Sequence, residues 1–370
     1  MKYVRMPIER ESPEEFGYGR IRNNLSESSI RDLSLSQLGI DLSDLTLFYG
    51  SHRGDERLRA LIAQASGVSP DEVLVTAGAA GALFIVATTL LEPDDHLVVV
   101  RPNYATNIAT PQAIGCAMTF VDLAFASGFR LDLDAVAAAI RPNTRLISVT
   151  CPHNPTGVVM PAADLERLVA LAARHGCRLL VDETYRDMTY GAPLPTAASL
   201  GPCAISVSSM SKSYGVPGIR VGWVITRDAA LYESFLAAKE QIGICGSVID
   251  EAIAAQVLEQ RDQLLSDTHA RIGQRLKTMR EWIAGEPLVD WVEPTGGVVC
   301  LPHLSGLVGR DMTRFHQRLL ADHGTYVGPG HWFDMPAQFV RIGFDWPTAD
   351  ELQHGLAGIS AAMRAELAAS

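Results

Sequence analysis

Short apolar runs rich in Val, Ile and Leu alternate with amphipathic stretches between Val73 and Thr226. The runs are apolar on both faces, which is typical of parallel strands that helices cover on either side. The pattern therefore predicts an α/β fold with a mostly parallel, doubly wound sheet in a large domain. The expected strands cover residues 73–76, 96–100, 145–150, 177–182, 204–209 and 221–226, and two of the expected helices cover 79–91 and the residues after Pro161.

The pattern changes after Arg227. A long helical stretch is expected over about 228–285 from its apolar periodicity. Beyond Gly285, short strand-like runs alternate with helices near 311–323 and 348–367, which predicts a smaller α+β domain. The expected strands there are 289–292, 297–301, 325–328 and 338–343. We expect three parts: an N-terminal segment (1–45) that packs with the small domain, a large domain (46–264) and a small C-terminal domain (265–370).

The charge balance and the motif content exclude several function classes. With 31 Lys and Arg against 42 Asp and Glu, the net charge of −11 disfavours binding to nucleic acid. The longest apolar run, from Ala77 to Leu91, is too short to span a bilayer, and the first residues carry no secretory signal. The six cysteines are scattered and no H-E-x-x-H occurs, so neither a disulfide framework nor a metal site is indicated. We expect a cytoplasmic protein without a membrane partner.

Polar residues follow the expected strands at the edge where a doubly wound sheet binds its ligands. A glycine-led turn at Gly78 opens the first helix, and its free N–H groups suit a phosphate. A lysine among apolar strand ends loses its proton readily and becomes a nucleophile for a carbonyl. The residues that follow the strands are Gly78, Ala79, Ala80 and Gly81; Tyr104; Asn154; Asp182 and Tyr185; and Ser209, Ser211 and Lys212, with Arg220 shortly after.

These residues together describe a site for pyridoxal 5′-phosphate (PLP). Ser209, Ser211 and Arg220 offer hydroxyl donors and a bidentate cation to the phosphate. An aspartate at a neighbouring strand end can hold a protonated ring nitrogen, and an aromatic residue such as Tyr104 can stack on the ring. The set therefore favours a PLP enzyme.

Three motifs carry a resemblance to a known family. Asn154-Pro155-Thr156-Gly157, Asp182-x-x-Tyr185 and Ser209-x-x-Lys212 with Gly218-x-Arg220 occur in the order and spacing of the class I/II aminotransferases, and Arg341 lies in FVRIGF near the end. From about Leu47 to the C-terminus the chain resembles these fold-type-I PLP enzymes. The resemblance implies a PLP-transferase fold, PLP as the cofactor and a homodimer.

The resemblance also implies a role for each matching residue. Lys212 would form a Schiff base with PLP and shuttle a proton, Asp182 would keep the ring nitrogen protonated, and Tyr185 would complete the catalytic set. Arg341 and Asn154 would bind the substrate. The expected cofactor contacts are Gly78, Ala79, Ala80, Tyr104, Asn154, Asp182, Tyr185, Ser209, Ser211, Lys212, Arg220 and, reaching the site of the other subunit, Tyr49.

Two departures from the family pattern concern phosphate and substrate binding. The phosphate turn has Ala80 and Gly81 where relatives carry polar side chains, so backbone groups would bind the phosphate there. The segment 24–29 lacks the glycine that relatives place near the substrate carboxylate. Glu27 in this segment is interpreted first as a helix cap or a water-facing residue, and a contact with a cationic substrate side chain is the alternative. The acidic cluster Glu9, Glu11, Glu14 and Glu15 is interpreted as a solvated face.

The primary functional prediction is an aminotransferase that moves the amino group of a small α-amino acid to a 2-oxo acid. The alternative is a PLP-dependent β/γ-elimination or cyclisation enzyme with a cationic substrate, either a C–S lyase or an enzyme similar to capreomycidine synthase. Residues 54–59 and 211–223 resemble that branch. A serine acyl-transfer site at Ser209-x-x-Lys212 would need S-D-N and K-T-G motifs, which the sequence lacks. A PLP-sensing regulatory domain is disfavoured because no basic DNA-binding segment precedes the fold.

Overall fold

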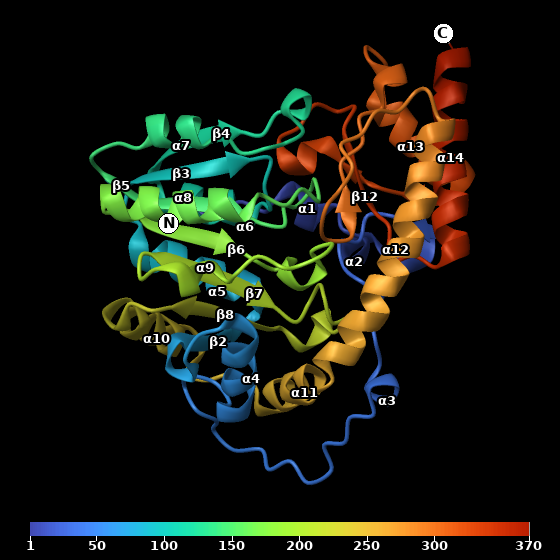
Figure 1. Ribbon diagram of the computed structural model, residues 1–370. Helices are drawn as coiled ribbons and strands as arrows, with labels where there is room; N and C mark the ends of the chain where they lie inside the picture. Colours follow the sequence, from blue (N-terminus) through green and yellow to red (C-terminus); the bar gives the residue numbers. More distant parts are fainter. Residues whose placement is uncertain (370) are drawn as a thin grey trace.

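A seven-stranded sheet forms the centre of the structure, a computed structural model that describes residues 1–369 (Figure 1). The strand order is β2-β8-β7-β6-β5-β3-β4; β8 is antiparallel to both of its neighbours, β2 and β7, and the other pairs among the described residues are parallel. The predicted mostly parallel sheet is confirmed. The strands are β2 (Val73–Ala77), β3 (His96–Arg101), β4 (Ala117–Asp122), β5 (Thr144–Thr150), β6 (Arg178–Asp182), β7 (Ala204–Ser209) and β8 (Val221–Thr226).

Helices cover both faces of this sheet, as the apolar runs require. Successive strand residues point to opposite sides: Val98 belongs to the core beneath α8, whereas Leu97 packs in the core with α5 and α10. Both faces of the large sheet are therefore buried. The helices around it are α4 (Glu56–Ser66), α5 (Gly78–Leu90), α6 (Thr106–Ile114), α7 (Leu133–Ala139), α8 (Ala162–His175), α9 (Ala197–Leu200), α10 (Ala229–Gly243) and α11 (Val248–Glu259).

The helical stretch expected over 228–285 is divided into α10, α11 and α12 (Arg261–Gly285). The first break falls at Ile244, whose positive φ of 60° ends α10, and Ser247 then caps α11 by accepting a hydrogen bond from Asp250 N. The apolar periodicity continues through these breaks, which is why the sequence did not separate the helices. In Figure 1, α12 runs from the end of the sheet domain to the C-terminal part of the molecule.

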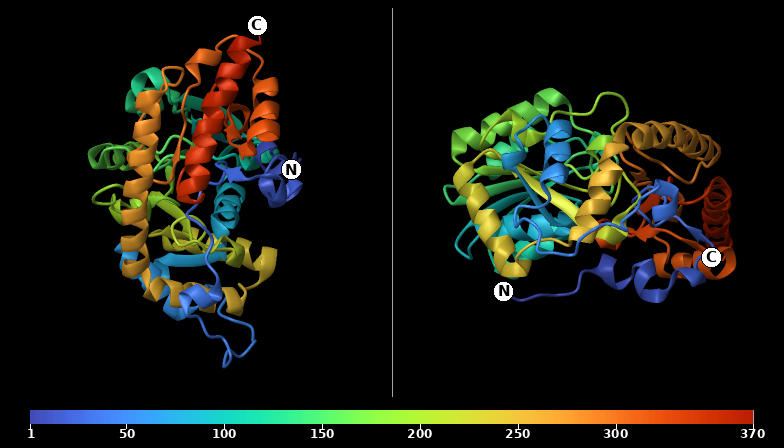
Figure 2. Two further views of the ribbon diagram at one scale, coloured as in Figure 1. Left: turned by 90° about the vertical axis from the view of Figure 1, so that its right-hand side faces the viewer. Right: turned by 90° about the horizontal axis from the view of Figure 1, so that it is seen from below.

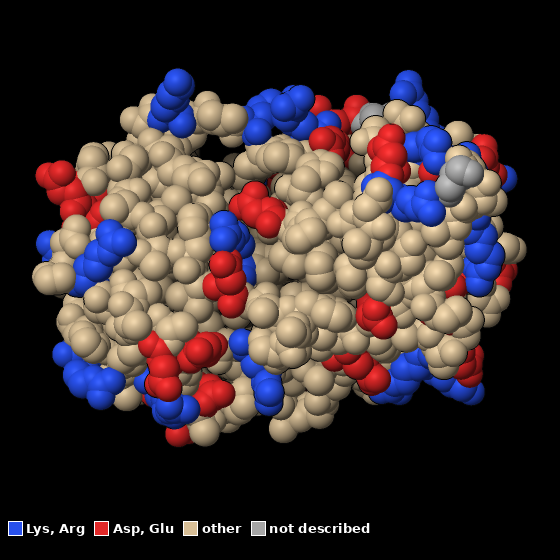
Figure 3. All heavy atoms as spheres, turned by 90° about the horizontal axis from the view of Figure 1, so that it is seen from above, with Lys and Arg blue, Asp and Glu red and all other residues tan. Residues whose placement is uncertain are grey.

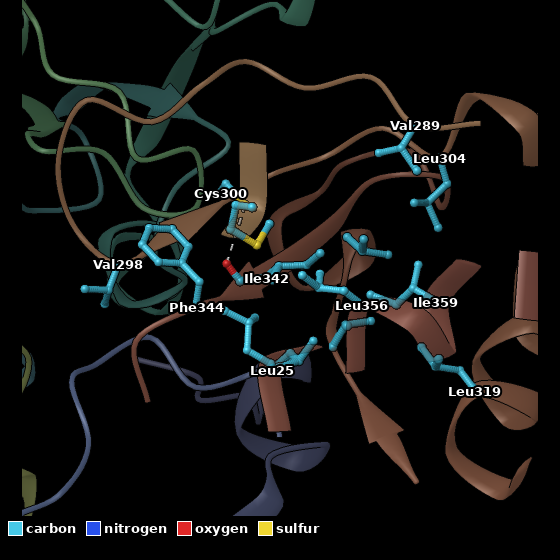
Figure 4. Close-up of a cluster of buried hydrophobic side chains, with 14 of the residues drawn as sticks. Leu25, Val289, Val298, Cys300, Leu304, Leu319, Ile342, Phe344, Leu356 and Ile359 are labelled. Atoms are coloured by element: carbon cyan, nitrogen blue, oxygen red, sulfur yellow. Dashed lines mark hydrogen bonds between the residues drawn. The ribbon is translucent and has the colours of Figure 1, made fainter. Parts of the chain in front are cut away.

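The C-terminal part contains a small antiparallel sheet of order β11-β12-β9, covered by helices. The predicted strand at 289–292 is wrong, because only one isolated bridge, between Asp290 and His303, forms there. Figure 4 shows the core of this part, where Ile342, Leu356 and Leu25 meet. The elements are β9 (Val299–Cys300), α13 (Met312–His323), β10 (Thr325–Tyr326), β11 (Gly328–Pro329), β12 (Val340–Gly343) and α14 (Ala349–Ala368).

The N-terminal segment contacts both parts of the molecule. It contains α1 (Pro7–Arg10), α2 (Pro13–Phe16), β1 (Asn23–Asn24) and α3 (Leu35–Leu38), and β1 pairs in parallel with β10. Its first residues run along the molecule toward the C-terminal part (Figure 2), and Lys2 N donates to Ala113 O on α6 at 3.0 Å. The segment therefore packs against the sheet side as well as the C-terminal part. The domain limits at residues 45 and 264 stay predictions.

The surface mixes both signs of charge. On the face shown in Figure 3, basic and acidic side chains are interspersed. No helix within residues 1–369 is long and apolar enough to cross a bilayer.

Candidate active site

A cavity of about 560 Å³ lies where the sheet, the N-terminal segment and the C-terminal part meet. The structure brings most of the predicted site residues to its wall, from elements far apart in the sequence. They are Glu27, Ala79, Ala80, Tyr104, Asn154, Asp182, Tyr185, Ser209, Ser211, Lys212, Arg220 and Arg341. Gly78 adjoins this wall through Arg220, whereas Tyr49 is 82% exposed between α3 and α4. The roles given to these residues stay predictions.

Lys212 is partly buried in the turn that follows β7. Its Nζ donates to Ser28 Oγ at 3.1 Å, and the backbone of the turn is held by Ile30 N, which donates to Lys212 O at 3.1 Å. Burial lowers the pKa of Lys212, and the nearby Glu27 carboxylate opposes this shift. The lysine is therefore an amine that loses its proton more readily than one in water.

Asp182 ends β6 and is buried at the cavity wall. Burial raises the pKa of its carboxyl, while hydrogen bonds and the charge of Lys212 act in the other direction. Oδ1 accepts from Thr184 N at 3.1 Å and from Thr184 Oγ1 at 2.6 Å, and Oδ2 accepts from Asn107 Nδ2 at 3.4 Å. These donors stabilise the carboxylate that a protonated ring nitrogen requires.

An anion cradle forms at the first turn of α5. The helix has no side-chain cap, so its first N–H groups remain open to a ligand. Gly78 has a φ of +70°, and a Cβ at this position would clash with the guanidinium of Arg220. Arg220 Nη1 in turn donates to Ser211 Oγ at 3.3 Å. Backbone N–H groups, a guanidinium and hydroxyls thus lie together, as phosphate binding requires. A residue with a Cβ at position 78 would leave no room for the guanidinium of Arg220.

Arg341 on β12 contributes a buried guanidinium to the cavity wall. Nη1 donates to Asn154 Oδ1 at 3.2 Å, and Nη2 donates to Ser26 O at 2.6 Å. Its Nε has no hydrogen-bond partner within residues 1–369. The rings of Trp332 and Phe333 lie 5.8 and 5.0 Å from the guanidinium carbon. A buried cation with an unused donor suits a carboxylate ligand.

Besides Asp182, four carboxylates face the same cavity: Glu9, Glu14, Glu27 and Asp32. Glu27 Oε1 accepts from Tyr18 OH at 3.1 Å, and burial is the main cause that raises the pKa of Glu27. None of the four makes an ion pair with another residue in the range 1–369. No group of three or more acidic, His or Cys side chains in that range could hold a metal ion.

The N-terminal acidic cluster differs from its interpretation as a solvated face. Glu9 and Glu14 are exposed, but they line the cavity. Glu11 Oε2 accepts from Trp332 Nε1 at 2.7 Å, so this residue joins the segment to the C-terminal part. Sequence reasoning missed these contacts because residues 1–20 show no periodicity that would place them.

Other residues near the site were also missed. Ser28 contacts Lys212, and its carbonyl oxygen accepts from Tyr185 OH at 2.7 Å. Burial raises the pKa of Tyr185 to about 12. The only sequence signal for Ser28 was the departure of residues 24–29 from the family pattern.

Comparison with known proteins decides the family. The model of the family "Aminotransferase class I and II" matches residues 26–359. The chain belongs to this family. It is 33% identical to capreomycidine synthase of Streptomyces vinaceus, covering 91% of this chain and 87% of the relative. It is also 32% identical to arginine–pyruvate transaminase of Pseudomonas aeruginosa, covering 80% of this chain and 77% of that one.

Solved structures show the same fold. A PLP-dependent aminotransferase from Streptococcus suis superposes with a TM-score of 0.91 at 28% identity, covering 99% of both chains. A PLP-dependent cyclase superposes with a TM-score of 0.90 at 26% identity, covering 99% of this chain and 98% of the other. The fold is therefore the fold-type-I PLP-enzyme fold, and the cofactor is PLP. The cradle at Gly78, the buried carboxylate of Asp182 and the amine of Lys212 fit this group.

Proposed function

We propose that this protein transfers the α-amino group of an amino acid with a cationic side chain to a 2-oxo acid. The observation that carries the proposal is the set of carboxylates Glu9, Glu14, Glu27 and Asp32, which face the same cavity as Lys212. These four carboxylates make no ion pair within residues 1–369, although Lys212, Arg220 and Arg341 line the same cavity, so they can attract a cationic side chain and repel an acidic one. The proposed substrate is longer than the small amino acid expected from the sequence.

The cofactor would be held by the residues that the sequence predicted. When bound, PLP supplies an aldehyde that joins an amine and a ring that withdraws electrons from the substrate Cα. Ser209 and Arg220 would hold the phosphate with the first N–H groups of α5, and Asp182 would face the ring nitrogen. Lys212 Nζ, whose pKa is lowered by burial, would take the proton from the substrate Cα.

Both ends of the substrate have a partner in the cavity. Arg341 would bind the α-carboxylate through its unused Nε and its Nη groups, while Asn154 Oδ1 fixes the guanidinium. Glu27 would receive the cationic end, and Tyr18 holds its carboxylate in place. The five N–H donors of a guanidinium can satisfy several carboxylates at once, which favours an arginine-like side chain over an ammonium. The name of the arginine–pyruvate transaminase supports this choice.

Cyclisation is the second candidate reaction. Its support is the match to capreomycidine synthase over 91% of this chain, together with the structural match to a PLP-dependent cyclase. The same charge arrangement would serve it, because the substrate would again be cationic. The two reactions differ in whether an amino-group acceptor is consumed.

The test is a panel of amino acids added to the purified holoenzyme. Arginine and citrulline have side chains of similar length but different charge, as do ornithine and norleucine, and each of the four is given with and without pyruvate. We expect arginine to change the visible spectrum at the lowest concentration and to yield alanine only when pyruvate is present. Turnover of arginine or a hydroxylated arginine without any oxo acid would favour cyclisation. If no amino acid alters the spectrum, the proposal is wrong.

We also propose that the protein is a homodimer in which Tyr49 reaches the phosphate of the other subunit. The support is the apolar, exposed stretch Leu47, Phe48 and Tyr49. It precedes His52, whose Nδ1 is 2.7 Å from Glu240 Oε1 on α10. Exposed apolar surface of this kind is typical of interfaces. Light scattering would give the oligomeric state, and Tyr49→Phe should weaken PLP binding without dissociating the dimer. The cytoplasmic location stays a prediction.

A further inference from the structure

We propose that Asn103 is a positioning residue that fixes both side chains predicted to contact the cofactor ring, Tyr104 and Asp182. The inference rests on the roles proposed for those two residues, and it does not depend on the substrate. Asn103 itself was given no role from the sequence.

One amide oxygen joins three elements of the sheet edge. Asn103 Oδ1 accepts from Tyr104 N at 2.8 Å, from Thr150 Oγ1 at 2.7 Å and from Asn107 Nδ2 at 3.4 Å. Its Nδ2 donates to Val100 O at 3.4 Å, and the side chain is 99% buried. The oxygen therefore ties the loop after β3 to the end of β5 and to α6.

Asn107 carries this connection to Asp182. Its Nδ2 also donates to Asp182 Oδ2 at 3.4 Å, so its two N–H groups have one acceptor each, Asn103 and Asp182. Ser148 Oγ donates to Asn107 Oδ1 at 3.4 Å. The Asn107 amide is thus held on both sides in one orientation.

Loss of the Asn103 oxygen would affect both ring contacts. Asp182 lies where burial opposes its ionised form, so each hydrogen bond to its carboxylate matters. An Asn107 amide that is free to rotate would no longer donate to Asp182 steadily. At the same time the Tyr104 backbone would lose its hydrogen bond to the Asn103 side chain.

A purely structural role makes a different prediction. A buried, hydrogen-bonded asparagine that only supports the fold would lower the thermal stability when replaced, without altering the cofactor. A positioning role changes how tightly PLP binds and how its spectrum titrates. These two properties can be measured without any substrate, so a failure of the positioning proposal can be distinguished from a failure of the proposed reaction.

The experiment uses holoenzyme with Asn103→Ala, with Asn143→Ala as the control, since Asn143 lies on the surface and donates to Asp94 O. We expect the dissociation constant for PLP to rise roughly tenfold, the effect of a lost hydrogen bond to a buried group. We also expect the pH midpoint of the visible band to rise, because a less ionised Asp182 leaves the ring less positive and a less positive ring holds a neighbouring proton more tightly. Unchanged affinity and midpoint would overturn the proposal.

A second variant covers the case in which Asn103→Ala does not fold. Asn103→Asp has nearly the same volume and keeps the oxygen acceptor, but it loses the Nδ2 donor to Val100 O. If the oxygen carries the role, this variant should keep the PLP affinity within about threefold of wild type. A loss as large as roughly tenfold in Asn103→Asp would show that the acceptor is not what positions the ring contacts.

Discussion

Lys212 Nζ donates a hydrogen bond to Ser28 Oγ at 3.1 Å, although 184 residues separate the two in the sequence. The carbonyl oxygen of the same serine accepts from Tyr185 OH at 2.7 Å. One residue of the N-terminal segment thus contacts two residues of the predicted catalytic set. The segment is therefore part of the reaction cavity as well as a cover for it.

Replacing the lysine should remove both the covalent link to PLP and the proton acceptor. We expect Lys212→Ala to lower kcat by at least ~10³-fold, within the range for removal of a general base. Borohydride reduction of wild-type holoenzyme followed by peptide mass mapping should label residue 212. Lys277→Ala is the control, because Lys277 is exposed on α12 and pairs with Glu281. A labelled peptide elsewhere would contradict the assignment.

Ser28→Ala should shift the pH dependence of the reaction. The serine hydroxyl accepts from the protonated amine, so its removal disfavours the charged form of Lys212 and lowers its pKa further. A hydrogen bond to a charged group is worth about 1.5 kcal/mol, which corresponds to roughly one pH unit. We expect the acidic limb of the kcat profile to move down by about that amount. The neighbouring variant Ser29→Ala should leave the limb in place.

Glu27 should control the preference for a cationic substrate. Glu27→Gln removes one negative charge at constant shape, and we expect KM for arginine to rise about tenfold while KM for norleucine changes little. Glu15→Gln is the matched control, since Glu15 pairs with Arg5 on the surface. An equal change for both substrates would argue against the assigned role.

The same preference should depend on pH. Burial raises the pKa of Glu27 above its ordinary value of 4.5, so the carboxylate is present above the raised pKa and is lost as the pH falls through it. KM for arginine should therefore rise as the pH is lowered, whereas KM for norleucine should not. In Glu27→Gln the arginine dependence should flatten.

Glu183 should make the folded protein less stable as the pH rises. Burial raises its pKa from 4.5 to about 7, although its Oε1 accepts from Ala197 N at 2.6 Å and from Ser206 Oγ at 2.9 Å. The unfolded chain ionises above pH 4.5 while the folded protein keeps the proton until about pH 7, so stability falls across this window. Glu183→Gln keeps the acceptor without the charge and should remove a loss of about 3 kcal/mol.

The stability difference can be measured by unfolding both proteins in denaturant at pH 5 and pH 8. Glu183→Gln should gain relative to wild type at pH 8 and differ little from it at pH 5. A constant difference between the two proteins at both pH values would show that Glu183 does not titrate in this window.

The sheet and the residues proposed to contact the cofactor could be predicted from the sequence because their signals are local. Asp182 and Lys212 directly follow apolar runs, and the carboxyl ends of parallel strands meet at one edge. Gly78 was readable for a similar reason, since the first turn of a helix after a strand requires a residue with positive φ here. The places of these residues in the fold are determined by the few residues next to them in the sequence.

The residues on the substrate side of the cavity could not be predicted in the same way. Glu9 and Glu14 lie on short helices without a periodic pattern, and tertiary contacts such as that of Glu11 with Trp332 bring them to the cavity. Asn107 lies on α6, which the sequence analysis did not predict, so its contact with Asp182 had no local signal. The breaks inside 228–285 were hidden because the apolar spacing continues across Ile244.

The parallel pairing of Asn23 with Thr325 has a consequence for biosynthesis. A chain that has left the ribosome only as far as Arg220 already carries the residues proposed to bind the phosphate, but β10, the partner strand of β1, has not yet been translated. The pairing of β1 must therefore wait until nearly the whole polypeptide has emerged. The residues proposed to bind the amino acid, Glu27 and Arg341, are therefore the last to be brought together.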